Sequence, residues 1–216
     1  MAVDFPDVTD SLKNPNGLLA IGAALTEKRL LCAYKKGIFP WFNEGQPVLW
    51  WSPDPRCVIK PNEVHISHSL RKILRKKKFE ITYNQDFKSV INECSMNRNN
   101  NDTWLTDSMK IAYTHLHNSG YAHSIECWHN EKLIGGLYGI AMGKIFFGES
   151  MFSRESSASK ITLIHLARRL NDMKFKIIDC QVSSDHLLTL GAKHIARKEF
   201  IKILNDYCDY SKTTLI

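Results

Sequence analysis

The chain has 216 residues, of which 44% are hydrophobic, 24% charged and 10% aromatic, a composition typical of one large or two small globular domains. Its longest nearly apolar run, Leu18 to Leu25, is too short to span a bilayer, and the first residues lack the features of a secretory signal. Lys and Arg number 29 against 22 Asp and Glu, and the resulting net charge of +7 permits a polyanionic partner without identifying one.

Residues 1–60 are predicted to form a small N-terminal domain of short elements separated by prolines. Thr26 is a suitable N-cap for a helix whose apolar face includes Leu30 and Tyr34. A short apolar run at 48–52 is predicted to be a strand.

Residues 61–216 are predicted to form a larger domain, because no proline follows the asparagine-rich stretch at 97–101 and the segments there lengthen. Three consecutive strand patterns predict an antiparallel meander. A meander followed by helix, strand and helix is typical of an acetyltransferase-like domain, so we expect an α+β fold class, a mixed α/β architecture. Helices are expected at 69–78, 106–120, 159–173 and 185–190, and strands at 79–83, 122–129, 132–140, 144–147 and 175–181.

Six cations lie within eight positions with no acid among them, so most of the net charge is concentrated in this basic segment. Such a run is usually a solvated helix face. Clustered like charges also repel one another, and the phosphates of a nucleic acid would relieve that repulsion. Both interpretations stay open at this point. The basic segment consists of Arg71, Lys72, Arg75, Lys76, Lys77 and Lys78.

Three of the five tryptophans, Trp41, Trp50 and Trp51, fall within eleven residues beside prolines. A packed corner of the core would explain them. Tryptophan is also a good surface on which an unpaired base can stack, and the basic segment favours that alternative.

Cysteine and histidine spacing does not predict a metal site. The six cysteines are all more than 20 residues apart, so no Cys-x-x-Cys pair is present, and we expect reduced thiols in the cytoplasm. His65 and His68 are three residues apart, but no carboxylate or thiolate lies at a helpful spacing, and we interpret them as surface residues. We therefore expect no metal site. No cofactor is expected either, and the lack of a long apolar run predicts no membrane partner.

Two segments at predicted strand ends could carry chemistry. The segment 148–154 follows a strand and precedes a helix, but 153–160 contains no glycine, which excludes a P-loop and disfavours a coenzyme A pyrophosphate loop. Asp179 and Gln181 alternate along the last strand, so their side chains are expected on the same face. Two polar groups on an otherwise apolar strand are costly unless they are hydrogen-bonded or functional.

Several long and unusual motifs occur in order between about residue 5 and residue 205. The most distinctive are Gly37-Ile38-Phe39-Pro40-Trp41-Phe42 and Leu49-Trp50-Trp51-Ser52-Pro53-Asp54-Pro55-Arg56. Others lie at 15–20, 65–67, 104–106, 123–126, 135–139, 148–153 and 178–182. Together they resemble the bacterial leucyl/phenylalanyl-tRNA–protein transferases. The chain departs from that family at Gly22-Ala23-Ala24-Leu25, where Gly-Gly-Asp-Leu is usual.

The resemblance implies an aminoacyltransferase. Such enzymes take Leu or Phe, and Met less well, from aminoacyl-tRNA and join it to the N-terminal Arg or Lys of an acceptor protein. The product is marked for degradation by the N-end rule. The implied fold is a small N-terminal domain, here 1–60, followed by a basic connector helix and a catalytic domain similar to the GNAT acetyltransferases, here 61–216.

The resemblance also implies roles for particular residues. Asp179 and Gln181 are implied in catalysis, and the basic segment in holding the tRNA acceptor stem. Trp41, Trp104 and Glu149 are implied around the terminal adenosine and the aminoacyl ester. The side-chain pocket would be lined by Leu137, Phe146, Met151, Leu163, Leu166, Leu170 and Ile178.

The implied reaction is aminolysis of an ester that is already activated, so it needs no nucleotide, metal or covalent nucleophile. An α-amino group with a pKa of about 7.7–8.0 is partly neutral near pH 7. The Gln181 amide could accept a hydrogen bond from this amine while Asp179 orients the amide, and Asp179 acting as a direct base is the alternative. Glu149, Glu155 and Asp185 are candidates for recognising the basic acceptor residue.

Two other functions remain as alternatives. One is a small-molecule acyltransferase that uses coenzyme A, which the missing glycine loop disfavours. The other is a non-catalytic RNA-binding module, which the polar pair at 179 and 181 disfavours.

Overall fold

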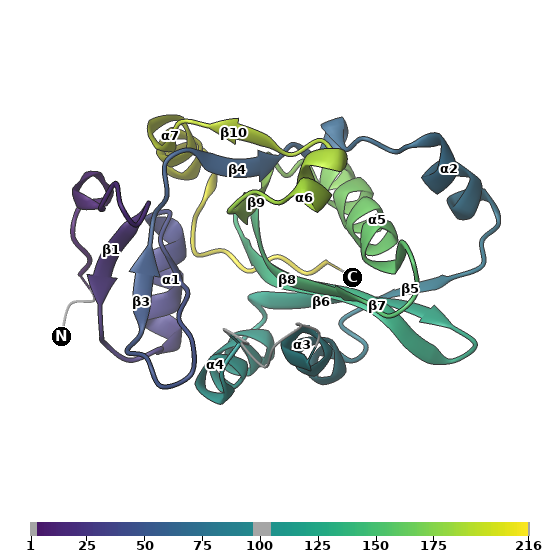
Figure 1. The fold of residues 1–216 in the computed structure, drawn as a ribbon, viewed down its shortest axis with the longest axis horizontal. Helices are drawn as coiled ribbons and strands as arrows, with labels where there is room; N and C mark the ends of the chain where they lie inside the picture. The colour runs from purple at the N-terminus through teal and green to yellow at the C-terminus, as the bar shows by residue number, and fades with distance from the viewer. Residues whose placement is uncertain (1–3, 97–104, 216) are drawn as a thin grey trace.

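The computed structural model describes residues 4–96 and 105–215, and it has a mixed α/β fold built on two sheets (Figure 1). The smaller sheet is antiparallel and consists of β1 (Leu18–Ile21), β3 (Leu49–Trp51) and β2 (Phe39–Pro40), in that order. Helix α1 (Glu27–Lys35) begins after Thr26, whose hydroxyl accepts a hydrogen bond from the main-chain nitrogen of Arg29. The predicted N-cap is therefore confirmed.

The larger sheet has seven strands in the order β10-β4-β9-β8-β7-β6-β5 within the described residues. Its strands are β4 (Arg56–Ile59), β5 (Glu80–Tyr83), β6 (Ala122–His129), β7 (Lys132–Met142), β8 (Ile145–Ser153), β9 (Ile177–Gln181) and β10 (Lys193–Ile195). The predicted antiparallel meander is confirmed as β6, β7 and β8. β8 and β9 run parallel, because α5 (Ala158–Asp172) connects them as a crossover. Their pairing ends at Phe147 and Asp179, although both strands continue.

Helices cover both faces of the larger sheet (Figure 1). α3 (Phe87–Met96) and α4 (Asp107–Asn118) pack on one face, and α5 packs on the other. Thr106 caps α4 as predicted, with its hydroxyl accepting a hydrogen bond from the main-chain nitrogen of Met109. The other helices are α2 (His68–Arg75), α6 (Asp185–Thr189) and α7 (Arg197–Tyr207), with 3-10 turns at Val8–Asp10 and Pro61–Glu63. Among the described residues, no helix is both long and apolar enough to cross a membrane.

Strand β4 has no recognisable strand pattern in the sequence. All four of its residues are buried, so the strand lacks the alternation that marks a half-exposed strand, and it follows directly on a run of prolines. It lies between β10 and β9 in the larger sheet. Residues 56–59 therefore contribute to the larger sheet, and the domain division at residue 60 stays a prediction.

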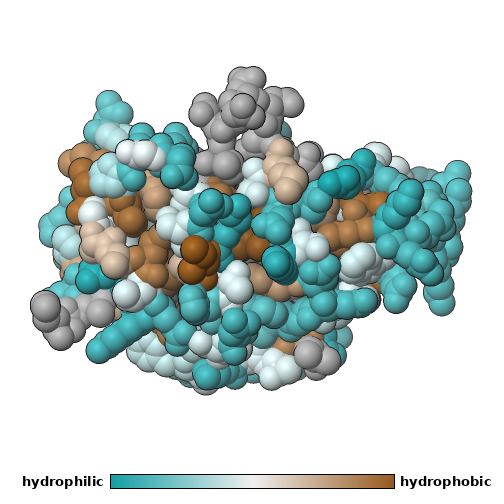
Figure 2. All heavy atoms as spheres, turned by 90° about the horizontal axis from the view of Figure 1, so that it is seen from below, coloured by the Kyte–Doolittle hydropathy of each residue, from teal (hydrophilic) through white to brown (hydrophobic). Residues whose placement is uncertain are grey.

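The surface differs between the two ends of the molecule. On the face shown in Figure 2, hydrophilic residues cover the right-hand end, where Figure 1 places α2 and the β6–β7 hairpin. Apolar side chains gather at the opposite end, where the N-terminal elements lie. Leu12, Ile21 and Trp41, all from the N-terminal part of the chain, are 49%, 66% and 40% exposed.

Ala23 is expected to lower stability, because its φ of 72° lies in the left-handed region that favours glycine. Replacing Ala23 by Gly should increase the free energy of unfolding by about 1 kcal/mol, since the relieved strain exceeds the extra entropy of the unfolded chain. The measurement is urea unfolding followed by circular dichroism. Ala24→Gly is the matched control, because Ala24 is also exposed and has no positive φ, and it should decrease the same free energy by about 0.5 kcal/mol. Equal changes in the free energy of unfolding for the two substitutions would contradict backbone strain at Ala23.

Candidate active site

A cavity of about 560 Å³ lies where β8 and β9 stop pairing. Its apolar wall includes most of the predicted pocket residues, contributed by β7, β8, α5 and β9. Glu149 and Gln181 provide polar groups at the same cavity. The predicted pocket residues in its lining are Leu137, Phe146, Met151, Leu163, Leu166 and Ile178.

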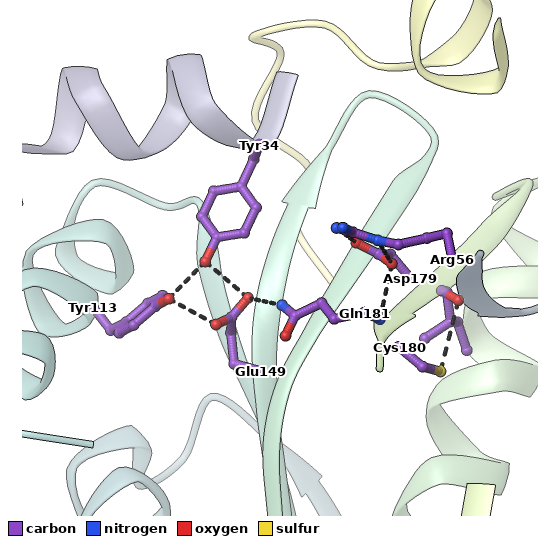
Figure 3. A network of polar contacts seen from close by, with 8 residues as sticks. Tyr34, Arg56, Tyr113, Glu149, Asp179, Cys180 and Gln181 are labelled. Atoms are coloured by element: carbon purple, nitrogen blue, oxygen red, sulfur yellow. Dashed lines mark hydrogen bonds and ion pairs between the residues drawn. The ribbon is translucent and has the colours of Figure 1, made fainter. Parts of the chain in front are cut away.

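The carboxylate of Glu149 is the centre of a hydrogen-bonded network (Figure 3). The hydroxyl of Tyr34 donates to Oε1 at 2.8 Å, and the hydroxyl of Tyr113 donates to Oε2 at 2.6 Å. The two tyrosine hydroxyls are themselves 2.6 Å apart. The side-chain amide nitrogen of Gln181 donates to Oε1 of Glu149 at 2.9 Å. Both tyrosine side chains are fully buried, so they hold the carboxylate from inside the core.

The number of protons in this network bears on the charge of Glu149. The three short contacts among Tyr34, Tyr113 and Glu149 need three protons, and the two hydroxyls supply only two. A protonated Glu149 supplies the third: it donates to one tyrosine hydroxyl in place of accepting from it, that hydroxyl donates to the other tyrosine, and a ring of three hydrogen bonds closes. Burial is the largest influence on this carboxyl and raises its pKa to about 7, and the nearby charge of Asp179 acts in the same direction. The two hydroxyls and the Gln181 amide oppose that rise. Glu149 therefore changes its protonation state near neutral pH.

Gln181 ends β9 in an uncommon backbone conformation, with a φ of 62°. Its main-chain nitrogen donates to Oδ1 of Asp179 at 3.0 Å, while its side chain lines the cavity. The Asp179 carboxylate is fully buried and does not line the cavity. The prediction that the two side chains share a face is therefore wrong here, because the left-handed turn breaks the alternation of the strand. The amide is held by Glu149, and Asp179 holds the main chain of Gln181.

Asp179 also forms a buried ion pair with Arg56 of β4. Nε and Nη2 of Arg56 donate to Oδ1 and Oδ2 of Asp179 at 2.8 and 2.7 Å. Both side chains are at most 1% exposed. The guanidinium carbon lies 4.7 Å from the ring centres of both Phe39 and Phe200, so the cation contacts two aromatic faces.

The remaining predicted site residues lie in different places. Trp41 lines the cavity and packs against Trp51, with ring centres 5.8 Å apart. Trp104 lies outside the described residues. Leu170 is on α5 but is buried in the core and is not part of the cavity lining. All six residues of the basic segment are exposed, on α2 and the turn after it, and Lys78 lies 3.9 Å from a carboxylate oxygen of Glu155.

Three residues of the site were missed by the sequence analysis as functional groups. Tyr34 and Tyr113 lie at helical spacing among apolar residues, so their pattern predicts core positions, and only the fold shows what their hydroxyls contact. Arg56 ends one of the most distinctive motifs, and that motif was the available signal.

The arrangement can hold an apolar group beside an amide and a carboxyl. No group of three or more His, Cys, Asp or Glu side chains in the described residues is arranged to bind a metal ion. The chemistry that these side chains can supply is hydrogen bonding and proton transfer near neutral pH, with much of any rate coming from positioning.

Comparisons with known proteins identify the relatives of this chain. Residues 58–205 match the family model described as leucyl/phenylalanyl-tRNA protein transferase, and residues 23–54 match the model of that family's N-terminal domain. A leucyl/phenylalanyl-tRNA–protein transferase of Pseudomonas aeruginosa is 52% identical over 211 residues, which cover 97% of this chain and 93% of that protein. One from Cellvibrio japonicus is 53% identical over 204 residues, covering 94% and 87%.

Solved structures resemble the chain more distantly. A conserved protein of unknown function from Staphylococcus epidermidis aligns with a TM-score of 0.43 and 14% identity, covering 83% of this chain and 68% of that one. L-PGS from Bacillus licheniformis aligns with a TM-score of 0.41 and 11% identity, covering 74% and 54%. Similarity at this level does not assign a function.

Proposed function

The chain belongs to the leucyl/phenylalanyl-tRNA–protein transferase family and is an enzyme of that family, and we propose that it transfers Leu or Phe, and Met less well, from aminoacyl-tRNA to proteins that begin with Arg or Lys. The observation that carries this proposal is the apolar cavity with Gln181 and Glu149 beside it. Such a site suits an aminoacyl ester whose side chain is buried and whose carbonyl faces a polar, hydrogen-bonding surface.

The apolar cavity would bind the side chain of the transferred amino acid. Leu, Met and Phe would all fit an apolar wall, and charged side chains would be excluded by the cost of removing them from water. The volume of about 560 Å³ is also larger than one such side chain, so part of the cavity would hold the ester and the acceptor amine.

Narrowing this pocket should change the preference between Phe and Leu. Leu163 lines the cavity, so Leu163→Phe should reduce kcat/KM for Phe transfer more than for Leu transfer, and the Phe-to-Leu ratio should fall roughly tenfold. Leu170→Phe is the matched control, because Leu170 lies on the same helix but outside the cavity lining. That control should destabilise the fold by overpacking and leave the ratio unchanged. An equal shift of the ratio in both variants would contradict this pocket.

Gln181 would orient the attacking amine. Because its amide nitrogen donates to Glu149, its amide oxygen can accept a hydrogen bond from the α-amino group of the acceptor. The burial of Asp179 supports an orienting role for that residue and disfavours a direct base, since its oxygens are held by Arg56 and by the main chain of Gln181. Asp179 would therefore act through the conformation of Gln181.

Glu149 is the best placed of the three acids considered for recognising the basic acceptor residue. It lines the cavity, whereas neither Glu155 nor Asp185 does. Glu155 instead accepts a hydrogen bond from the ring of His129 and lies near Lys78. We assign acceptor recognition to Glu149 in its ionised form, which would attract the cationic N-terminal residue.

The basic segment would hold the tRNA acceptor stem, because its cations are exposed at the end of the molecule that Figure 2 shows as hydrophilic. Trp41 lines the cavity and is exposed, so it is suited to stack on the terminal adenine. Trp104 is proposed to contact the same adenosine and the aminoacyl ester.

The crossover from β8 through α5 to the parallel strand β9, with the cavity where the strands stop pairing, supports the GNAT-like catalytic domain proposed for residues 61–216. The small domain proposed for residues 1–60 contributes β4 to the same sheet. We place the reaction in the cytoplasm, where the product would enter N-end rule degradation.

One assay tests the proposed function. The purified chain is incubated with tRNA carrying labelled Leu or Phe and with a model protein that begins with Arg. Label should appear in that protein and not in the same protein with an acetylated N-terminus. Binding of tRNA without transfer would instead support an RNA-binding module. Acyl transfer from coenzyme A, without transfer from tRNA, would support the small-molecule acyltransferase.

A further inference from the structure

Arg56 occupies a buried position directly behind the proposed active site. Its guanidinium binds both oxygens of Asp179, and one of those oxygens accepts the main-chain hydrogen bond of Gln181. The chain of contacts therefore runs from Arg56 through Asp179 to Gln181, and then from the Gln181 amide to Glu149. Figure 3 shows these groups in that order. Arg56 does not line the cavity, so it would influence a substrate through this chain or through Phe39, which lines the cavity and contacts the guanidinium.

Stability alone is a poor explanation for this ion pair. Buried ion pairs often stabilise a fold no better than apolar side chains of the same volume, because both charges lose their hydration. Nη1 of Arg56 is buried and has no hydrogen-bond partner among the described residues, which adds a further cost. The planar fork of arginine nevertheless fixes the orientation of a carboxylate through two parallel hydrogen bonds.

The position of Gln181 needs such support. Its φ of 62° is an uncommon conformation for a residue other than glycine, and it is maintained here by the hydrogen bond from the Gln181 nitrogen to Asp179. The rings of Phe39 from β2 and Phe200 from α7 both contact the guanidinium, so Arg56 is itself fixed by elements outside the larger sheet.

We propose that Arg56 is a positioning residue for the transfer reaction: it locks the Asp179 carboxylate, which in turn holds Gln181 in the left-handed turn that directs its amide into the cavity. This inference rests on the proposed function. A lysine at position 56 would keep the charge but would provide a single point of contact in place of the fork. The carboxylate could then rotate, and the amide of Gln181 would lose its fixed orientation.

The test is a double-mutant cycle on the full chain, with kcat and KM measured for Leu transfer from tRNA. Arg56→Lys should lower kcat at least roughly tenfold, because orientation is lost, while KM for aminoacyl-tRNA stays within about twofold. Gln181→Ala should also lower kcat. The double variant should be no slower than Gln181→Ala alone, because Arg56 acts through Gln181. A merely structural role would instead give effects that multiply.

Arg197→Lys is the matched control. Arg197 is partly buried, whereas Arg56 is fully buried, and its Nη1 donates to the carbonyl oxygen of Ser52 at 2.6 Å, but it contacts neither Asp179 nor Gln181 in the hydrogen bonds of the described residues. Its kcat should stay within about twofold of wild type, since it is outside the chain of contacts. If Arg56→Lys does not fold, the same cycle with Phe200→Leu, which removes one ring from the guanidinium, decides the question.

Three results are distinguishable. A wild-type chain that transfers neither Leu nor Phe contradicts the proposed function. An active wild type with an unchanged kcat in Arg56→Lys contradicts only the role of Arg56. The role of Arg56 is also contradicted if the reductions in kcat from Arg56→Lys and Gln181→Ala multiply in the double variant.

Discussion

Substituting Glu149 by Gln should make the protein more stable than wild type at pH 8 and similar to it at pH 5. Between these values the difference in free energy of unfolding should rise by up to about 3 kcal/mol. The cause is the carboxyl at the centre of the tyrosine network, whose pKa burial raises from 4.5 to about 7. In the folded protein this carboxyl retains a proton that the unfolded chain has already lost.

The sign follows from proton binding. Between about pH 4.5 and pH 7 the folded state binds more protons than the unfolded state, so wild-type stability from this group is lost as the pH rises. A glutamine is neutral throughout, and its amide oxygen can accept a hydrogen bond from one tyrosine hydroxyl while its amide nitrogen donates to the other. Burial keeps the pKa of both tyrosines well above the usual value, so their hydroxyls remain donors over this range.

The measurement is urea unfolding of both proteins at intervals from pH 5 to pH 8. Glu155→Gln is the matched control, since Glu155 lies six residues further along the chain and the hydrogen bond from His129 lowers its pKa. That variant should show a small dependence of opposite sign. Parallel stability curves for wild type and Glu149→Gln would show that the carboxyl is ionised across the whole range.

The second large effect is expected on tRNA binding. Replacing Lys72 and Lys76 together by serine should lower the affinity for aminoacyl-tRNA roughly 30-fold at 0.1 M salt, if each lysine neutralises one phosphate. The slope of log affinity against log salt concentration should also become less steep by roughly 1.5, because fewer counterions are released on binding. Both side chains are exposed, so folding should be unaffected.

Lys198 and Lys202 provide the matched control for this pair. They are also four residues apart and exposed, but they lie on α7, at the far end of the larger sheet from β5 and α2 in Figure 1. Filter binding at a series of salt concentrations compares the two double variants. If both change the slope equally, the tRNA responds to the net charge of +7 and not to the basic segment.

Much of the fold could be predicted from local signals. Thr26 and Thr106 cap helices because each hydroxyl reaches a main-chain nitrogen three residues ahead, which depends on neighbouring residues alone. The meander of β6, β7 and β8 could be predicted because strand alternation and short connections are also local. α3 has buried residues at helical spacing, yet it was missed along with β4, whose uniform burial shows no period.

The residues of the site also divide into those that the sequence predicts and those that it does not. The apolar wall could be predicted from motifs that resemble one family, apart from Leu170, which the structure places in the core and outside the cavity lining. The expected common face of Asp179 and Gln181 failed because a single left-handed residue reverses the direction of the side chain. That conformation depends on a hydrogen bond to a carboxylate held by a distant arginine.

The amino-acid sequence alone determined the family, the concentration of positive charge and the apolar character of the pocket, since these depend on residue identity and spacing. The tertiary structure decided which side chains meet. Arg56 and Asp179 are 123 positions apart, and Tyr34 and Glu149 are 115 apart, yet each pair forms short hydrogen bonds. Such contacts arise only when the chain packs, and burial there changes the protonation of Glu149 and the conformation of Gln181.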